Sequence, residues 1–196
     1  MSKVLLVGKG APDRGGIPTF LQTLRTSELA ALHDITFLNV AHSGTPEGGK
    51  VSAGNIRRTL QDAWRVFRQG RSHDIVHIHS ALAPAVTVAR GGLLVLAGRL
   101  AGCAVIMHAH GGNIETWLTT PLRRRLMRWA MAPAKLVVAV WSTGEQALAD
   151  TLGPDRVRLI DNGVPEPNLP RAVETYDPPR VLYVGLLTPR KGVLDL

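Results

Sequence analysis

Four of the seven histidines are the first candidates for chemistry in this 196-residue sequence. His77 and His79 form one pair and His108 and His110 another, and each pair lies at the end of a short run that predicts a buried strand. Ligands of an open parallel sheet bind outside the carboxyl ends of its strands, so both pairs should face the functional site. Small residues follow at 111–113 and leave the His110 ring accessible for donation to a hydroxyl or for proton transfer. The alternative is a satisfied polar group at a strand end.

A metal site is the second hypothesis that the histidines raise. Side chains two residues apart on a strand share a face, so each pair could clamp a metal ion. No cysteine lies near either pair, and the nearby carboxylates, Glu115 and Asp13, are on predicted loops. Because the ligand set of each pair is incomplete, we predict that the protein binds no metal and needs no cofactor.

A glycine-rich turn follows the first predicted strand, with the sequence GKGAPDRGG at positions 8–16. Gly15 and Gly16 open the next predicted helix, and backbone N–H groups at a helix start can hold a phosphate. The turn has Asp13 where a dinucleotide fingerprint requires glycine, and it lacks the Gly-Lys-Ser/Thr of a P-loop. The turn is therefore a candidate phosphate site that belongs to neither of these two motifs. The alternative is a glycine-rich turn that merely allows tight packing.

Short β-branched runs alternate with segments of helical period, a pattern typical of α/β folds with a parallel sheet covered on both faces. The six predicted strands are 3–7, 35–40, 74–79, 104–108, 136–140 and 157–160. Thr120 before Pro121 predicts the N-cap of a helix over 121–132. Ser142 and Glu145 predict a capping box for a helix that Gly153 ends.

The composition changes after residue 160. Five prolines within 161–180 predict a linker between a first domain, 1–160, and a second one. The run 181–185 predicts the first strand of that second domain, and 189–196 its first helical turn. A strand and one turn cannot form a core, so we expect a truncated second domain.

The charge balance favours an anionic partner, since 23 basic residues face 15 acidic ones, for a net charge of +8. The single cysteine, Cys103, excludes a disulfide framework and makes a cytoplasmic location the expectation. Arg90 and Arg99 interrupt the most apolar stretch, 82–107, so we predict no transmembrane helix.

Two predicted helices are basic and amphipathic. In 55–71, apolar residues share one face and arginines an adjoining one; the apolar set is Ile56, Leu60, Ala63 and Phe67, and the arginines are Arg57, Arg58, Arg65 and Arg68. In 121–132 the predicted inner stripe is Leu122, Leu126 and Trp129, opposite Arg124, Arg125 and Arg128. Arginines beside Trp64 and Trp129 suggest a surface for anionic lipid headgroups, although a solvated charged face is the usual explanation. No recognised motif supports nucleic-acid binding.

The order of these features resembles family-four glycosyltransferases, which are retaining GT-B enzymes that use nucleotide-diphosphate sugars. The matching segments are Gly15-Gly16, 74–79, His110-Gly111, 137–142, 162–164, 181–185 and 189–192. The resemblance implies a Rossmann-like parallel sheet flanked by helices as the N-terminal domain of a two-domain fold. The N-terminal domain would bind mainly the acceptor and the C-terminal one mainly the nucleotide.

The resemblance also implies roles for individual residues. Gly15 and Gly16 would lie by the donor diphosphate, and His110 by the transferred sugar as the catalytic residue. Lys191 would pair with the phosphates, together with Arg190, because Leu186 stands where members often have arginine. We assign the acceptor or sugar side of the site to His108, Asn113 and Glu115.

The function implied is transfer of a sugar, with retained configuration, to a glycan or lipid-linked acceptor in polysaccharide biosynthesis at the cytoplasmic membrane face. The glutamates that hold the donor belong to the rest of the second domain, so we expect this chain alone to be inactive. Two alternatives stay open: a non-catalytic, membrane-binding half of a split transferase, and a sugar-nucleotide epimerase of similar fold.

Overall fold

The computed structural model describes residues 1–41, 52–111 and 113–163, with residues 178, 180, 182, 183, 193 and 194. The chain divides into two units, Met1–Pro165 and Glu166–Leu196, and the first holds the described helices and strands. The predicted strand 181–185 and helical turn 189–196 fall largely outside the described residues, as does most of the predicted linker 161–180.

A six-stranded parallel sheet forms the centre of the first unit, in the order β2-β1-β3-β4-β5-β6. The strands are β1 Lys3–Gly8, β2 Asp34–Asn39, β3 Ile75–Ser80, β4 Ala104–Ala109, β5 Leu136–Ala139 and β6 Val157–Leu159. Each of the six predicted strands is found within one or two residues of its predicted bounds. The predicted α/β class and Rossmann-like sheet are confirmed.

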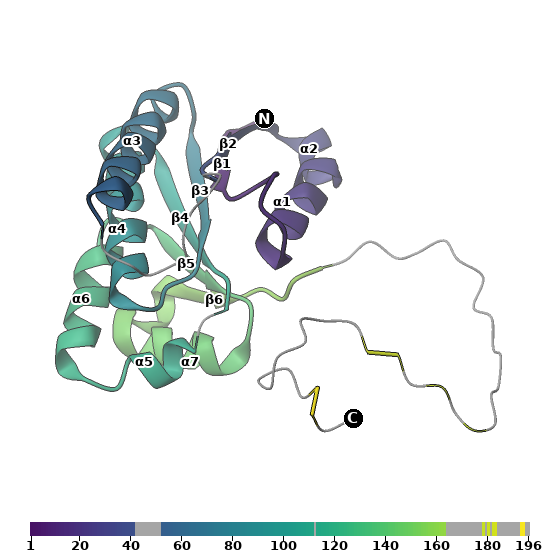
Figure 1. Ribbon diagram of the computed structural model, residues 1–196. Coiled ribbons are helices and arrows are strands. Elements are labelled where there is room, and N and C mark those ends of the chain that lie inside the picture. Colours follow the sequence, from purple (N-terminus) through teal and green to yellow (C-terminus); the bar gives the residue numbers. More distant parts are fainter. Residues whose placement is uncertain are drawn as a thin grey trace. The chain divides into compact units, whose positions relative to one another are not determined.

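Helices cover both faces of this sheet (Figure 1). They are α1 Gly16–Thr26, α2 Leu29–Leu32, α3 Ala53–Gly70, α4 Ala85–Leu100, α5 Ile114–Trp117, α6 Pro121–Met131 and α7 Ser142–Leu152. Figure 1 shows α1 and α2 on one side of the strands and α3, α4 and α6 on the other. No described helix is both long enough and apolar enough to cross a lipid bilayer.

Alternation along the strands divides the core between the two faces. On β3, Val76 and Ile78 are buried in the main hydrophobic cluster under α3 and α4. His77 and His79 point to the opposite face, where the ring of Phe20 from α1 packs against His79. The main core therefore lies on the α4 side, and the histidines lie on the α1 side.

A close helix crossing sets the helix layer. A Cβ atom at Gly92 of α4 would lie 2.8 Å from the Cβ and 3.0 Å from the Cα of Ala130 on α6. Because the blocking atoms include backbone, a side chain at Gly92 would force the helices apart. The small residues Gly92 and Ala130 therefore fix which side of α6 faces the core.

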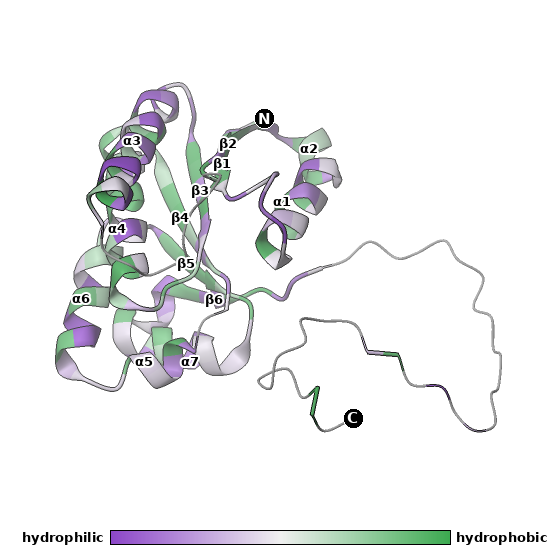
Figure 2. Cartoon of the chain, viewed as in Figure 1, coloured by the Kyte–Doolittle hydropathy of each residue, from purple (hydrophilic) through white to green (hydrophobic). Residues whose placement is uncertain are grey.

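This packing shows that the predicted inner stripe of α6 is wrong at two of its three positions, while Leu126 packs against the core as predicted. Leu122 and Trp129 are 76% and 72% exposed, whereas Met127, Ala130 and Met131 are buried. On α3, Ile56 and Leu60 of the predicted apolar face are also more than half exposed. The buried positions of α3 are Asp62, Ala63, Val66 and Gly70. Figure 2 shows that α3 and α6 carry both hydrophilic and hydrophobic residues, while the central strands are mainly hydrophobic.

A buried charge determines which face of α3 packs against the rest of the protein. Asp62 is fully buried, and its carboxylate accepts from Arg90 of α4 at 2.9 Å and from Arg65 at 3.5 Å. A buried carboxylate requires such partners. The ion pair of Asp62 with Arg90 therefore joins α3 to α4 through the face of α3 that carries Asp62. The apolar residues on the other side of α3 remain at the surface.

The predicted helix ends are confirmed at two places and wrong at one. The Thr120 side chain accepts from the Arg123 N–H, and Gly153, with φ 101°, ends α7. The predicted Ser142 capping box is wrong, because Trp141 is the N-cap of α7 and its carbonyl accepts from the Glu145 N–H at 3.0 Å. The helix begins one position earlier than the sequence motif suggests.

Candidate functional site

The strand order places the candidate site between β1 and β3. Chain order reverses there, since β2 lies on one side of β1 and β3 on the other. Ligands of open α/β sheets bind at such a switch point, outside the carboxyl ends of the strands. The glycine-rich turn leaves β1 at this edge, and the 111–113 loop leaves the neighbouring β4.

The glycine-rich turn is held by a side chain that sequence analysis missed. The Asn39 amide oxygen accepts from the Gly10 N–H at 3.0 Å and the Ala41 N–H at 2.9 Å, while its Nδ2 donates to the Ala11 carbonyl at 2.7 Å. Lys9 and Asp13 form an ion pair across the turn at 3.3 Å. The sequence did contain a signal for this role, namely an asparagine at the end of the second strand. A short amide side chain can both donate to and accept from the backbone of a neighbouring loop.

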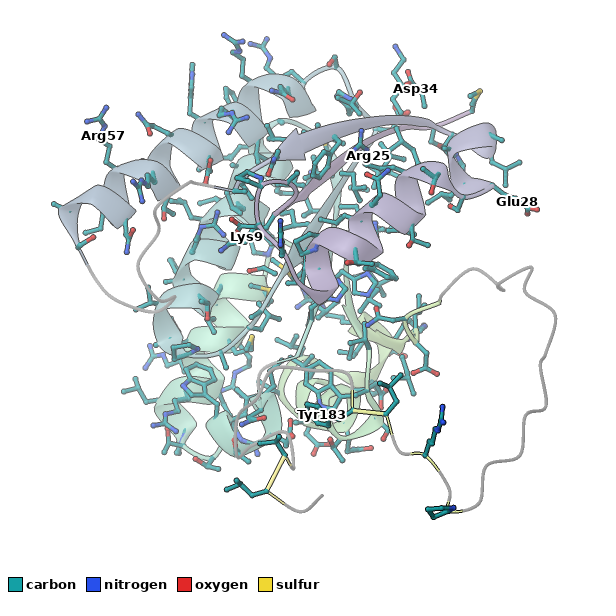
Figure 3. The ribbon with its side chains drawn as sticks, turned by 45° about the vertical axis from the view of Figure 1, so that its right-hand side comes forward. Lys9, Arg25, Glu28, Asp34, Arg57 and Tyr183 are labelled. Atoms are coloured by element: carbon teal, nitrogen blue, oxygen red, sulfur yellow. The ribbon has the colours of Figure 1, made fainter. Side chains whose placement is uncertain are left out.

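The start of α1 is open in the way a phosphate site requires. Gly15 is the N-cap of α1, with φ 136°, and no side chain of the described residues caps the helix. An ideal Cβ at either Gly15 or Gly16 would meet no described atom within 4 Å. Lys9 extends from the same turn (Figure 3). Among the described residues, nothing therefore blocks a phosphate from reaching Gly15, Gly16 or the first-turn N–H groups at the positive end of the helix.

The two histidine pairs form one cluster. His79 on β3 is the register partner of His108 on β4, so the parallel pairing sets the four rings side by side. Ring centroids are 4.7 Å apart for His79 and His108 and 4.5 Å apart for His108 and His110. Phe20 covers the cluster from α1, with its ring 5.2 to 5.7 Å from those of His79, His108 and His110.

Two contacts between ring nitrogens connect the cluster. His77 Nε2 lies 3.3 Å from His108 Nδ1, and His79 Nδ1 lies 2.9 Å from His110 Nε2. Within the described part of the chain, His79 Nε2 and His108 Nε2 are buried and have no hydrogen-bond partner. A buried polar atom without a partner is uncommon and calls for an explanation.

Burial keeps these rings neutral. It lowers the pKa of His77 to about 4, of His108 to about 3 and of His110 to about 4, and the charge of a neighbouring histidine adds to the effect at His77 and His108. Burial and the other three rings together hold the pKa of His79 well below its usual value. His110 therefore has little imidazolium at neutral pH, which favours hydrogen bonding over acid catalysis among its two predicted roles.

The other predicted sugar-side residues lie at different depths. His108 is 3% exposed, and its ring contacts that of Phe20. Asn113 is exposed and in the left-handed region, with φ 48°, at the start of α5. The Glu115 carboxylate accepts from the Trp141 indole N–H at 3.3 Å, which links the loops after β4 and β5.

Trp141 is a second residue that sequence analysis missed as part of the site. Its ring lies against Gly144, where any Cβ would collide with the indole. The signal was an aromatic residue directly after the fifth strand, followed by a small residue in the first turn of a helix.

The predicted arginine surface divides into two sets. Arg65 donates to the Asn39 carbonyl at 3.2 Å and contacts Asp62, and Arg124 donates to the Leu118 carbonyl at 2.9 Å. The exposed arginines of the set are Arg57, Arg68, Arg125 and Arg128, and Arg65 is also exposed, at 44%, despite its contacts. Figure 3 shows Arg57 pointing away from α3. Arg190 and Lys191, predicted to bind the diphosphate, lie outside the described residues.

The family model of Glycosyltransferase Family 4 matches residues 14–166, which include the α1 start and the histidine cluster. The chain belongs to Glycosyltransferase Family 4. The resemblance drawn from the motifs is thereby confirmed at the level of the family. No curated protein matches this family member in sequence.

Solved structures support the fold of this family member. HepE from Anabaena in complex with UDP-glucose has a TM-score of 0.54 at 13% identity, with 84% of this chain and 44% of HepE covered. S. aureus MnaA in complex with UDP has a TM-score of 0.50 at 13% identity, with 81% of this chain and 43% of MnaA covered. The chain therefore spans less than half the length of these similar proteins.

We expect the histidine cluster to make folding stability depend on pH. Above pH ~6.5, the pKa of an unfolded histidine, both states are neutral and this contribution is complete. As the pH falls toward 4, the unfolded chain takes up protons that the buried rings do not. The free energy of unfolding should fall by up to about 1.4 kcal/mol per pH unit for each such histidine.

The measurement is urea unfolding between pH 7 and pH 5 in EDTA, above the range where ordinary carboxyl groups titrate. In H108Q, the slope of the free energy of unfolding against pH should correspond to about one proton fewer taken up on unfolding. H73Q, at a histidine outside the cluster, is the matched control. An equal slope in H108Q and wild type would show that the buried rings do not cause it.

Proposed function

We propose that this chain is the acceptor-side half of an enzyme that transfers a sugar from a nucleotide-diphosphate sugar to a glycan or lipid-linked acceptor. The observation that carries the proposal is the uncapped, open start of α1 at the strand switch point, beside the loop of His110. Family membership supports the reaction class, and HepE bound to UDP-glucose supports a donor of this kind.

The open helix start suits the charge that the reaction develops. Breaking a glycosyl-phosphate bond increases negative charge on the leaving diphosphate, which fixed N–H dipoles stabilise without reorganising. Gly15 and Gly16 let the phosphates approach those dipoles closely. Lys191 and Arg190, in the second unit, would add cationic charge.

His110 is proposed to act as a neutral hydrogen-bond donor to the transferred sugar. Its Nε2 contacts His79 Nδ1 at 2.9 Å, so His79 holds the ring orientation and leaves the Nδ1 side for a hydroxyl. Asn113 and Glu115 follow in the same loop and short helix and would contact the sugar or acceptor.

Retention of anomeric configuration is proposed to occur by front-side attack. The two carboxylates predicted near the site are engaged elsewhere, Asp13 with Lys9 and Glu115 with Trp141. Neither is placed as an unengaged nucleophile of a double displacement. No metal takes part in this proposed transfer.

Activity should require more than these residues. The chain covers 44% of the length of HepE, and the resemblance places the donor-holding glutamates in the remainder of the second domain. We therefore propose that this chain alone is inactive. Sugar transfer should be assayed with the complete gene product.

Gly16→Leu should weaken donor use. A Cβ added at Gly16 meets no described atom within 4 Å, so the substitution should leave folding intact, and the leucine side chain should occupy the space proposed for the diphosphate. With UDP-glucose as the first donor probe, KM should rise about tenfold or more, a loss of about 1.4 kcal/mol of binding. G54L, in the first turn of α3, is the matched control. A KM unchanged in G16L would remove this turn from the donor site.

His110→Ala should lower kcat about 10²-fold, the lower end of the range for loss of one hydrogen-bond donor to the transition state. H110Q retains an N–H donor and should recover part of the rate. H73A is the control variant, because His73 lies just before β3, outside the cluster, and its Nδ1 contacts the Gln69 carbonyl. Transfer at the wild-type rate in H110A would exclude His110 from the mechanism.

A second proposal concerns a membrane surface on α3. Ile56, Leu60 and Trp64 follow one another at four-residue intervals and are 52%, 56% and 61% exposed. They line a shallow, open and mainly apolar depression that Arg57 borders. Exposed apolar residues beside arginines are typical of helices that lie at an anionic membrane. Such a surface suits a lipid-linked acceptor, or the membrane-binding half of a split transferase, and has no use in an epimerase of nucleotide sugars.

The chain should co-sediment with phosphatidylglycerol-containing vesicles at low salt. L60Q/W64Q should weaken this binding about tenfold or more, because each large apolar side chain contributes about 1.5 to 3 kcal/mol when buried. L32Q, at an exposed leucine of α2 on the other face, is the control. Failure of the wild-type chain to sediment would reject the membrane surface and leave the transferase proposal intact.

A further inference from the structure

We propose that His77, His79 and His108 form a binding site for a divalent transition-metal ion, with Zn²⁺ as the preferred ion. One ring nitrogen from each of the three residues lies within 4.8 Å of the others. The site bridges β3, which supplies two ligands, and β4, which supplies the third. This inference does not rest on the proposed transfer reaction, although the metal site includes His108 and adjoins His110, and it departs from the prediction that the protein binds no metal.

The distances suit tetrahedral zinc. Two nitrogens that each lie about 2.0 to 2.1 Å from a tetrahedral zinc are about 3.3 Å apart. His77 Nε2 and His108 Nδ1 already have this separation, at 3.3 Å. Since the three nitrogens lie within 4.8 Å overall, the third ring needs to move by about an ångström or more toward a shared ion.

An unpartnered nitrogen identifies the third ligand atom. His79 is 3% exposed, and its Nε2 has no hydrogen-bond partner among the described residues. Its other nitrogen, Nδ1, contacts His110 Nε2 at 2.9 Å. If Nδ1 carries the proton and donates to His110, the lone pair on Nε2 is available to a metal. A hydrogen bond from the opposite ring nitrogen is the usual second-shell support of a metal-bound histidine.

The ligand chemistry selects the class of ion. Neutral imidazoles suit zinc, copper and nickel, whereas magnesium and calcium require oxygen ligands. Phe20 packs over the rings and forms an apolar wall on the α1 side. A water molecule would complete the tetrahedron as the fourth ligand.

The first experiment is a calorimetric zinc titration of the 196-residue chain, stripped with EDTA and freed of any purification tag. We expect one zinc ion per chain with submicromolar affinity, and a higher thermal unfolding temperature with zinc than with EDTA. Cobalt substitution should give the visible absorption of a tetrahedral site. Absence of saturable one-to-one binding, or a cobalt spectrum of octahedral type, would overturn the proposal.

Variants test which residues hold the ion. H79Q and H108Q should each weaken zinc binding at least 100-fold, and H110A, which removes the supporting contact, about 10-fold. H73Q is the matched control at a histidine outside the cluster and should bind as wild type. Circular dichroism in EDTA checks that each variant folds, and the wild-type cobalt spectrum gives an answer even where one does not. Unchanged affinity in H79Q, or equal weakening in H73Q, would overturn the assignment.

Discussion

The parallel pairing of β3 with β1 and β4 is the constraint on which the site depends. It places Gly8 beside His79 so closely that a Cβ at Gly8 would lie 3.3 Å from the His79 Cβ. It also sets His79 opposite His108 in register. The glycine-rich turn, the histidine cluster and the 111–113 loop therefore meet at one edge, although nearly 100 residues separate the turn from the loop. A slip of one residue in this register would turn every histidine to the other face.

Burial of the histidines determines the chemistry open to them. Four rings lie together, three of them against Phe20, and a charge on any one would be poorly solvated and repelled by a charge on the next. The cluster is therefore neutral at physiological pH, and its members act as hydrogen-bonding groups or metal ligands rather than as acids. Among the described residues, the same burial leaves His79 Nε2 and His108 Nε2 without partners, and the proposed metal site accounts for the first of these two nitrogens.

The packing of α3, α4 and α6 against one another explains why large apolar side chains are exposed on α3 and α6. Gly92 lets α4 and α6 approach through small residues, and Asp62 binds Arg90 between α3 and α4. Both contacts turn small or charged residues inward, so Trp64 on α3 and Trp129 on α6 are left outside. An exposed face of this kind arises from packing geometry as much as from composition, and it gives the proposed membrane surface its physical origin.

The sequence by itself determined the local features of this protein. Strand runs, the Thr120 cap, the Gly153 stop and the open glycines at α1 depend on neighbouring residues, so their patterns could be interpreted one segment at a time. The inward face of α6 and the burial of Asp62 could not, because they depend on Gly92 and Arg90 of another helix. The histidines show the same division: their two pairs were evident at strand ends, but each pair alone is an incomplete ligand set. Only the tertiary structure, through the register of β3 and β4, joined them into one cluster.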